Sequence, residues 1–398
     1  MIVWLLLCLG IAVGGITILV VAINVSFGMG WKTGRMEHVA LLAGAAVGLT
    51  MLEVLRRWWL VPVVEWPWAM QAAAAACCLV AVVGLPLATW RRWSRTTPEG
   101  IERADTVLDL AGESGPSRFI GEGHHNWLLR IPGNESLGLV VHHWTARVPR
   151  LPAELDGLSI LHMTDLHFHR AYDRRYFEAV FDAAVDEPAD LVLVTGDLID
   201  DPACIEWITP LFERLQGPFG RFAILGNHDH MHLTGPIAEA VEAAGFTVLD
   251  GTAERVSVMG KAVAIGGTCA PWGPPIPADA LAGSPADFRL LMSHTPDLVY
   301  KAEKQGWDLV LSGHNHGGQV VLPGFGPVLM PSRYSRRFEQ GFYGVGRSLL
   351  YVSRGIGGKH PIRIGCPPEI AHFTLKAADP NPRPAESSTT RPASRSLV

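Results

Sequence analysis

The N-terminal region contains the feature that most restricts the fold of this chain. Residues 2–24 carry no charged side chain. A helix of that length crosses the ~30 Å hydrocarbon core of a bilayer. A cleaved signal peptide is the alternative, but no Lys or Arg precedes the run, and the run is too long for the apolar core of a signal peptide. We therefore expect a membrane-spanning helix here.

Two further apolar runs follow. Residues 38–55 form a shorter run that contains Glu53, and residues 68–90 form an Ala-rich run without charge. Indole rings prefer the membrane–water interface. Five tryptophans lie at the ends of the runs: Trp58, Trp59, Trp66, Trp68 and Trp90. We expect an α-helical transmembrane region of three helices over residues 1–95, in a multi-pass protein of the cell membrane.

Basic residues indicate the orientation of these helices. Arg56 and Arg57 are the basic residues on one side of the predicted region. The other side, which comprises loop 25–37 and the segment after the third run, holds five: Lys32, Arg35, Arg91, Arg92 and Arg95. Because Lys and Arg are enriched in cytoplasmic loops, three spans place the long C-terminal region in the cytoplasm. An even number of spans would reverse this orientation.

The region beyond residue 95 is acidic. Seven of the 33 basic and three of the 38 acidic residues lie before it, which leaves 26 basic and 35 acidic. Nucleic-acid binding is disfavoured, because phosphate backbones are bound by Lys and Arg. An acidic domain that handles phosphates needs another source of positive charge, such as metal ions. The six cysteines include no CxxC pair and are expected to be buried thiols. Three of them lie in the polar part of the chain, and this odd number favours a reducing compartment.

Strands alternate with helices in this acidic region. Apolar, β-rich runs occur at residues 158–164, 190–195, 221–225, 262–266, 288–293, 308–312 and 349–353. Amphipathic stretches occur at 174–185, 205–215 and 236–244. This alternation predicts an α/β domain, and the closely spaced later runs predict hairpins and therefore mixed sheets. We expect a linker at 96–126 with a helical turn near 101–110, the α/β domain at 127–376, and a disordered tail at 377–398.

Polar residues of a restricted kind follow five of these runs. They are Asp165, His167, Asp197, Asn227, His228, Asp229, His294, His314 and His316. Ligands of open α/β sheets gather at the carboxyl ends of strands, so we expect the five segments to converge on one crevice. Carboxylate, amide and imidazole groups suit Mn²⁺, Fe or Zn²⁺ better than Ca²⁺ or Mg²⁺. Each segment alone is common, but five in order predict a site for two divalent metal ions.

These segments resemble the signature of the calcineurin-like metallophosphoesterase superfamily. The matching segments are Asp165-Leu-His167, Gly196-Asp197, Gly226-Asn-His-Asp229, His294 and Gly313-His-Asn-His316. The flanking segments Arg150-Leu-Pro and Ser353-Arg-Gly-Ile-Gly357 are similar to the membrane-associated bacterial branch called YkuE-like. Many members of that branch have Thr where this chain has Asn315.

The resemblance implies a fold and a role for each segment. The fold would be an αββα sandwich. Asp165, His167 and His316 would bind the first metal ion, and Asp197 would bridge to the second. The second ion would be bound by Asn227, His294 and His314. The resemblance also makes His228 the catalytic histidine, held by Asp229.

Other polar residues lie beside these segments. His162, inside a strand, is expected in the core. His169, Arg170, His230 and His232 are candidates to line the site or meet the substrate. Three arginines, Arg333, Arg336 and Arg337, form either a solvated face or a contact for an acidic headgroup.

The expected function is hydrolysis of a phosphomonoester, phosphodiester or pyrophosphate bond by metal-activated hydroxide. Membrane anchoring makes lipid-linked molecules, such as UDP-diacylglucosamine or a phospholipid, candidate substrates. The alternative within the same class is a cyclic-nucleotide or general phosphodiesterase. An alternative of another class is a non-catalytic membrane scaffold or sensor, which the intact ligand set argues against.

Overall fold

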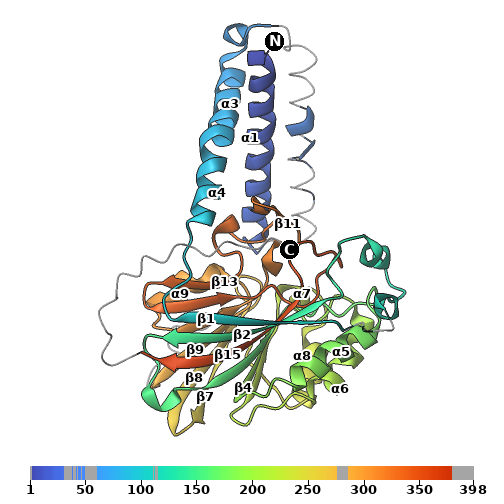
Figure 1. Cartoon of the computed structure of the whole chain (residues 1–398), viewed down its shortest axis with the longest axis vertical. Helices are drawn as coiled ribbons and strands as arrows, with labels where there is room; N and C mark the ends of the chain where they lie inside the picture. Colours follow the sequence, from blue (N-terminus) through green and yellow to red (C-terminus); the bar gives the residue numbers. More distant parts are fainter. Residues whose placement is uncertain are drawn as a thin grey trace.

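The computed structural model describes residues 2–30, 38, 42, 44–45, 47–49, 61–110, 112, 115–275 and 286–378. The second apolar run therefore lies largely outside the described residues, as does the predicted tail. The rest forms a two-sheet domain from which long helices rise (Figure 1).

The first sheet has seven strands. Its order is β1 (Ile101–Leu108), β2 (Leu139–Val148), β15 (Glu369–Ala377), β3 (Ser159–Met163), β4 (Leu191–Thr195), β5 (Arg221–Ile224) and β6 (Thr247–Val248). Strands β3 to β6 are parallel, whereas β1 with β2 and β15 with β3 are antiparallel. The sheet is mixed, as the sequence predicts.

The second sheet has six strands. Its order is β13 (Gly341–Val345), β14 (Ser348–Val352), β10 (Leu309–Ser312), β9 (Phe288–Ser293), β8 (Lys261–Thr268) and β7 (Ala253–Val258). Strands β8, β9, β10 and β14 are parallel, and the two outer strands are antiparallel to their neighbours. A separate short pair comprises β11 (Val321–Leu322) and β12 (Gly326–Pro327).

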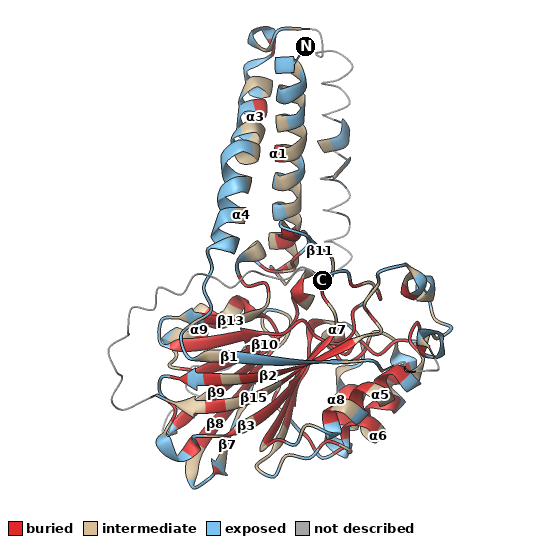
Figure 2. Ribbon diagram, viewed as in Figure 1, coloured by how far each residue is buried: buried red, intermediate tan, exposed pale blue. Residues whose placement is uncertain are grey.

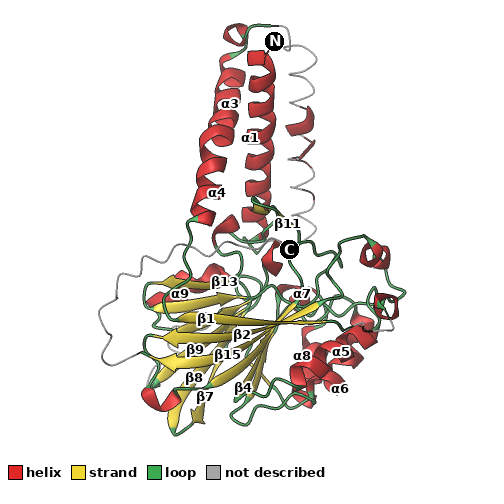
Figure 3. Ribbon diagram, viewed as in Figure 1, coloured by secondary structure: helices red, strands yellow, loops and turns green. Residues whose placement is uncertain are grey.

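Helices cover the outer faces of both sheets (Figure 3). Helices α5 (Arg174–Val185), α6 (Ile208–Phe212) and α8 (Thr234–Ala243) cover the first sheet, and α9 (Val299–Lys304) covers the second. In α5, Phe177, Val180, Phe181 and Ala184 recur at helical spacing and are buried. The expected αββα sandwich is confirmed.

Short 3₁₀ turns complete the chain. They are η2 (Val63–Glu65), η5 (Pro116–Phe119), η6 (Asn126–Arg130), η7 (Ala153–Leu155), η8 (Pro202–Trp207), η9 (Pro296–Leu298), η10 (His316–Gly318) and η11 (Ser335–Arg337). The predicted helix over 205–215 is divided between η8 and α6.

The helical turn expected near residues 101–110 is wrong. Residues 101–108 form the edge strand β1, paired with β2 from Ile101↔Ala146 to Leu108↔Leu139. The side chains of β1 are mostly exposed, so the strand lacks the apolar alternation that identifies a half-buried strand in a sequence. Its backbone pairing with β2 determines its structure, and the sandwich begins near residue 101 rather than at 127.

Two described helices are long and apolar enough to cross a membrane. One is α1 (Ile2–Phe27), and the other runs over Trp68–Trp93 as α3 (Trp68–Leu79), a π-helical turn η3 (Val80–Gly84) and α4 (Leu85–Trp93). Each has 26 residues, or about 39 Å of helix at 1.5 Å per residue. Their surfaces are largely exposed, in contrast to the buried sheets (Figure 2).

The two helices run in the same direction. Far from the sandwich, the rings of Trp4 and Trp66 lie 5.8 Å apart. Midway, the backbones approach so closely that a Cβ on Gly14 would lie 1.8 Å from the Cys77 carbonyl oxygen. Small residues permit such packing between apolar helices. Both C-terminal ends lie at the sandwich (Figure 1).

The C-terminal end of α1 is docked on the sandwich. Asn24 is 1% exposed. Its amide Nδ2 donates to the Val328 carbonyl at 3.2 Å and to Ser335 Oγ at 3.3 Å, and its Oδ1 accepts from the Met330 N–H at 2.9 Å. The end of α4 is held by Arg92, which pairs with Glu339 at 2.8 Å. The helix ends are therefore built into the domain.

Candidate metal centre

The predicted site residues converge at the carboxyl ends of parallel strands. Asp165 and His167 follow β3, Asp197 follows β4, and Asn227 begins α7 (Asn227–Met231) after β5. His294 follows β9, and His314 and His316 follow β10. The loops bond to one another: the Asp165 N–H donates to the Gly196 carbonyl at 2.9 Å, and the Gly313 N–H donates to the His294 carbonyl at 3.0 Å. Both sheets thus contribute to one centre.

Five of these residues have a left-handed backbone. Their φ angles are +52° at Asp165, +46° at His167, +54° at Asp197, +67° at His314 and +48° at His316. Residues other than glycine rarely adopt such angles, and the cost is tolerated mainly at functional sites. The strain marks these residues independently of any sequence motif.

Glycines allow the strand ends to approach the carboxylates. A Cβ on Gly226 would lie 2.0 Å from Asp197 Oδ1, and a Cβ on Gly313 would lie 2.1 Å from Asp165 Oδ2. Neither distance is compatible with a larger residue, so both glycines are required by the packing of the centre.

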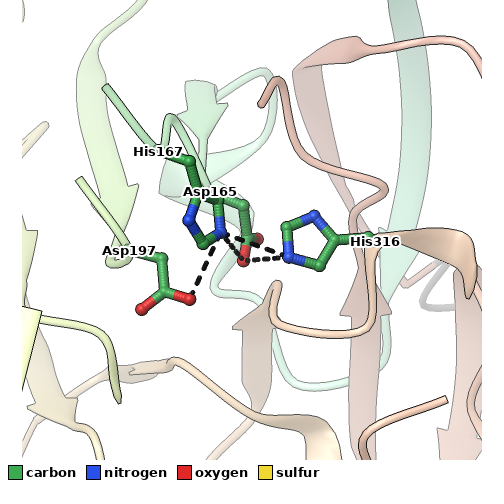
Figure 4. A group of neighbouring side chains, drawn as sticks. All are labelled: Asp165, His167, Asp197 and His316. Atoms are coloured by element: carbon green, nitrogen blue, oxygen red, sulfur yellow. Dashed lines mark hydrogen bonds and ion pairs between the residues drawn. The ribbon is translucent and has the colours of Figure 1, made fainter. Parts of the chain in front are cut away.

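One group of donors surrounds Asp165 (Figure 4). His316 Nε2 lies 3.5 Å from Asp165 Oδ1, and His167 Nε2 lies 3.9 Å from the same oxygen. The two Nε2 atoms lie 3.2 Å apart, and His167 Nε2 lies 3.4 Å from Asp197 Oδ2. The ligand atoms of Asp165, His167, Asp197 and His316 all lie within 4.8 Å of one another.

A second group shares Asp197 with the first. It comprises Asp197, His294 and His314. His294 Nε2 lies 3.4 Å from Asp197 Oδ2 and 2.9 Å from Asn227 Oδ1. The other ring nitrogen of His294, Nδ1, lies 2.8 Å from the Thr195 carbonyl, to which it donates. This bond fixes the tautomer in which Nε2 faces the centre. Asp197 thus belongs to both groups of donors, as a carboxylate that bridges two metal ions must.

The centre combines ionised carboxylates with imidazoles whose pKa values are shifted in opposite directions. Burial would raise the pKa of Asp197, but the His294 and His228 imidazoles hold it well below its usual value. Burial lowers the pKa of His314 and of His316 to about 3. Burial would also lower the pKa of His294, but Asp197 outweighs it and raises that pKa to about 9. The carboxylates thus attract positive charge to this place.

These donors fit divalent metal ions. His314 Nε2 is buried and has no hydrogen-bond partner among the described residues. His167 Nε2 and His316 Nε2 face each other beside two carboxylates, where a cation between the lone pairs would satisfy both nitrogens. Mixed imidazole and carboxylate donors suit first-row transition metals.

His228 is held by Asp200, a residue that the sequence reasoning missed. Its Nδ1 lies 2.5 Å from Asp200 Oδ1, and Asp200 Oδ2 also accepts from His167 Nδ1 at 2.9 Å. One carboxylate therefore orients a candidate ligand and the candidate catalytic histidine. Asp200 lies three residues after Asp197, and this spacing is the signal that could have identified it.

The expected contact between Asp229 and His228 is wrong. The Asp229 carboxylate accepts from three backbone N–H groups, those of Leu198, Ile199 and Gly226, at 2.8 to 3.1 Å. Asp229 is fully buried, whereas the His228 side chain is 17% exposed. Within α7 the two side chains point to different surroundings, and Asp229 holds the loops after β4 and β5 together.

The remaining candidates lie around the centre. His162 is buried in β3, as expected, with Nε2 2.8 Å from Thr195 Oγ1. His169 is bound to the Gly358 carbonyl at 3.2 Å, and Arg170 pairs with Asp201. His230 lies 3.5 Å from Asp250 and His232 is half-buried. Arg333 and Arg337 are exposed, and Arg336 lies 3.5 Å from Glu339.

A tryptophan that belongs to no motif lies beside the centre. The Trp272 ring lies 4.8 Å from the His314 ring and 6.4 Å from the His294 ring, measured between centroids. It follows β8, in a segment that contains none of the predicted site residues.

Comparisons with known proteins agree with this geometry. Residues 158–318 match the family model described as calcineurin-like phosphoesterase. The metallophosphoesterase YkuE of Bacillus subtilis is 32% identical over 252 residues, which cover 59% of this chain and 85% of YkuE. Phosphodiesterase YaeI of Escherichia coli is 30% identical over 54% of this chain and 82% of its own. UDP-2,3-diacylglucosamine pyrophosphatase LpxG of Chlamydia muridarum is 25% identical over 56% of this chain and 85% of LpxG.

Proposed function

Because the chain belongs to the calcineurin-like metallophosphoesterase family, and is thus a metal-dependent phosphoric ester hydrolase, we propose that it is a membrane-anchored enzyme with two metal ions that acts on a lipid-linked phosphoester. The observation that carries the catalytic part is the pair of donor groups that share Asp197. Two adjacent metal sites are the arrangement that clamps both sides of a phosphoryl transfer.

The proposed ligands divide between the two ions. Asp165, His167 and His316 would hold the first, and His294, His314 and Asn227 the second, with Asp197 shared. Mn²⁺, Fe or Zn²⁺ bound there would neutralise phosphoryl oxygens and lower the pKa of water. Asp200 and the Thr195 carbonyl keep Nε2 of His167 and of His294 directed inward.

His228 would act as the catalytic histidine. Its Nδ1–H donates to Asp200, which leaves Nε2 to bind a phosphoryl oxygen or to protonate the leaving oxygen. The partial exposure of the ring allows it to contact substrate. Asp229 would contribute by fixing the turn that carries His228.

The two long apolar helices support the anchoring. Since both run toward the sandwich, the chain between them must return to the far end. Described residues of the second apolar run lie beside α1 in reverse order: a Cβ on Gly15 would lie 4.0 Å from Val47, and one on Gly44 would lie 4.0 Å from Leu19. This order supports three spans, and with them the cytoplasmic placement that the basic residues favour.

Two relatives favour different substrates. LpxG is named as a UDP-2,3-diacylglucosamine pyrophosphatase, whose substrate is acylated. YaeI is named as a phosphodiesterase, which favours a general phosphodiesterase as the second candidate. Membrane anchoring favours an acylated substrate, because a tethered domain meets bilayer substrates at high effective concentration.

One experiment tests the proposed reaction. The full chain, purified in detergent, is analysed for bound metals and assayed with Mn²⁺ against diacylated and water-soluble phosphoesters, including a cyclic nucleotide. We expect two ions per chain and the highest kcat/KM with an acylated substrate. A chain that binds no metal and hydrolyses none of them would contradict the proposal, and a preference for cyclic or other soluble diesters would select the second candidate.

A further inference from the structure

The segment after β8 lies between the foot of α1 and the metal centre. A Cβ on Gly30, just beyond α1, would lie 2.5 Å from Pro271 Cγ. The next residue, Trp272, has its ring 4.8 Å from that of His314. Two consecutive residues thus make the contact with the end of α1 and the contact with a proposed metal ligand.

Trp272 is fixed in this position by its neighbours. The backbone N–H of Trp272 donates to the Cys269 carbonyl oxygen at 3.0 Å, and the backbone N–H of Gly273 donates to the same oxygen at 3.1 Å. On the other side, a Cβ on Gly273 would lie 2.4 Å from His230 Nε2 in α7. The segment is packed between anchor and α7, yet the Trp272 ring is only partly buried.

Exposed apolar residues neighbour, in the sequence, both residues that this segment contacts, Gly30 and His230. Met29, next to Gly30, is 44% exposed. Met231 and Leu233, which follow His230, are 43% and 52% exposed. With Pro271 and Trp272 they form a set that we call the apolar lane. Grouped exposed apolar residues commonly mark a binding surface.

We infer that the apolar lane receives the acyl chain of a bilayer-resident phosphoester and that Trp272 determines specificity for that chain. The inference rests on the proposed function. The lane begins at the end of α1 and passes directly to the His314 side of the centre. A chain leaving the bilayer along α1 would remain against apolar side chains while its phosphate reaches the metal site. A soluble nucleotide would gain nothing from these contacts.

The test compares two substrates with the same scissile bond. Hexadecyl p-nitrophenyl phosphate and methyl p-nitrophenyl phosphate release the same leaving group and differ only in alkyl length. The Mn²⁺-loaded full chain is reconstituted in phosphatidylcholine vesicles. We expect Trp272→Ala to lower kcat/KM by about tenfold or more for the hexadecyl ester and by less than about threefold for the methyl ester, since it removes an apolar contact with the chain. Trp272→Phe should retain most of the preference.

A matched control comes from the opposite end of β8. Met259, in the turn between β7 and β8, is 40% exposed and far from the carboxyl end of the strand. Met259→Ala should leave both substrates unchanged. An equal loss on both substrates in Trp272→Ala would overturn the inference, as would a wild-type chain that does not prefer the hexadecyl ester.

Binding without turnover separates this inference from the proposed reaction. Hexadecyl phosphate and methyl phosphate are titrated into the same vesicles, and the wild type is compared with Trp272→Ala. A Trp272-dependent preference for hexadecyl phosphate in a chain without hydrolysis supports the lane and contradicts the reaction. Hydrolysis without any such preference supports the reaction and overturns the lane.

Discussion

Two aspartates near His228, Asp200 and Asp229, should have different roles: replacing the first by Asn should lower activity, and replacing the second by Asn should lower stability. Asp200 accepts hydrogen bonds from His228 at 2.5 Å and from His167 at 2.9 Å. Removing its charge loosens both rings at once. Loss of the outer partner of a metal-binding histidine costs about 10- to 100-fold in metal affinity or activity. A misoriented general acid costs about 10²- to 10⁴-fold in rate. We expect kcat/KM of Asp200→Asn to fall by at least about 10²-fold at nearly unchanged stability.

Asp229→Asn should instead weaken the fold. Its carboxylate accepts hydrogen bonds from three buried backbone N–H groups. An amide NH₂ in place of one oxygen cannot accept, so it leaves at least one of these N–H groups unpaired. Each unpaired buried group costs about 1–3 kcal/mol. For a domain of this size each kcal/mol lowers Tm by about 2–4 °C. We expect a Tm lower by several degrees, with the protein that remains folded still binding metal.

The assay for both variants combines thermal unfolding in detergent, metal analysis and kcat/KM with bis-p-nitrophenyl phosphate. The reasoning is refuted if Asp229→Asn loses turnover at unchanged Tm while Asp200→Asn stays within a few-fold of wild type. That result would restore the pairing expected from the sequence.

Four further outcomes are expected. Asp197→Asn should release one metal ion and lose most activity, and two retained ions with activity within a few-fold would exclude a bridging role. His228→Ala should keep both ions but turn over about 10²- to 10⁴-fold more slowly, more so with an alkyl leaving group than with p-nitrophenolate, and an equal loss on both would remove the proton-donor role. Asn24→Leu should lower the Tm measured in detergent by several degrees, since it leaves the Met330 N–H and the Val328 carbonyl unpaired at about 1–3 kcal/mol each; an unchanged Tm would contradict the docking. A reporter fused behind β15 should be fluorescent as a fluorescent protein and inactive as alkaline phosphatase, and the opposite pattern would refute a cytoplasmic domain.

The strands that carry the centre were predictable because each combines two signals. An apolar run identifies a strand that is buried on both faces, and a polar segment at its end identifies the functional edge. All seven expected strands are present within a residue or two, from β3 to β14. The parallel pairing of β3 and β4 brings Asp165 and Asp197 together, and the stacking of the second sheet on the first adds His314.

The parts that the sequence did not predict depend on distant contacts. β15 lies between β2 and β3, although more than 200 residues separate it from either, and β1 is an exposed edge strand without apolar alternation. Asp200 and Asp229 are both aspartates close to proposed ligands. Only the turn geometry directs one toward His228 and the other toward backbone N–H groups.

The hydrogen bonds of Asn24 also fix the axial position of the first helix relative to the sandwich. Because its amide is held by Val328, Ser335 and Met330, the first helix cannot slide along its axis relative to the sandwich without breaking them. A slip of one residue would displace the helix by about 1.5 Å. With the anchoring proposed above, this helix would act as a rigid spacer rather than as a flexible tether, and it would hold the candidate metal centre at a constant distance from the bilayer. The proposed lipid-linked substrate would then need a headgroup whose phosphate projects to that distance.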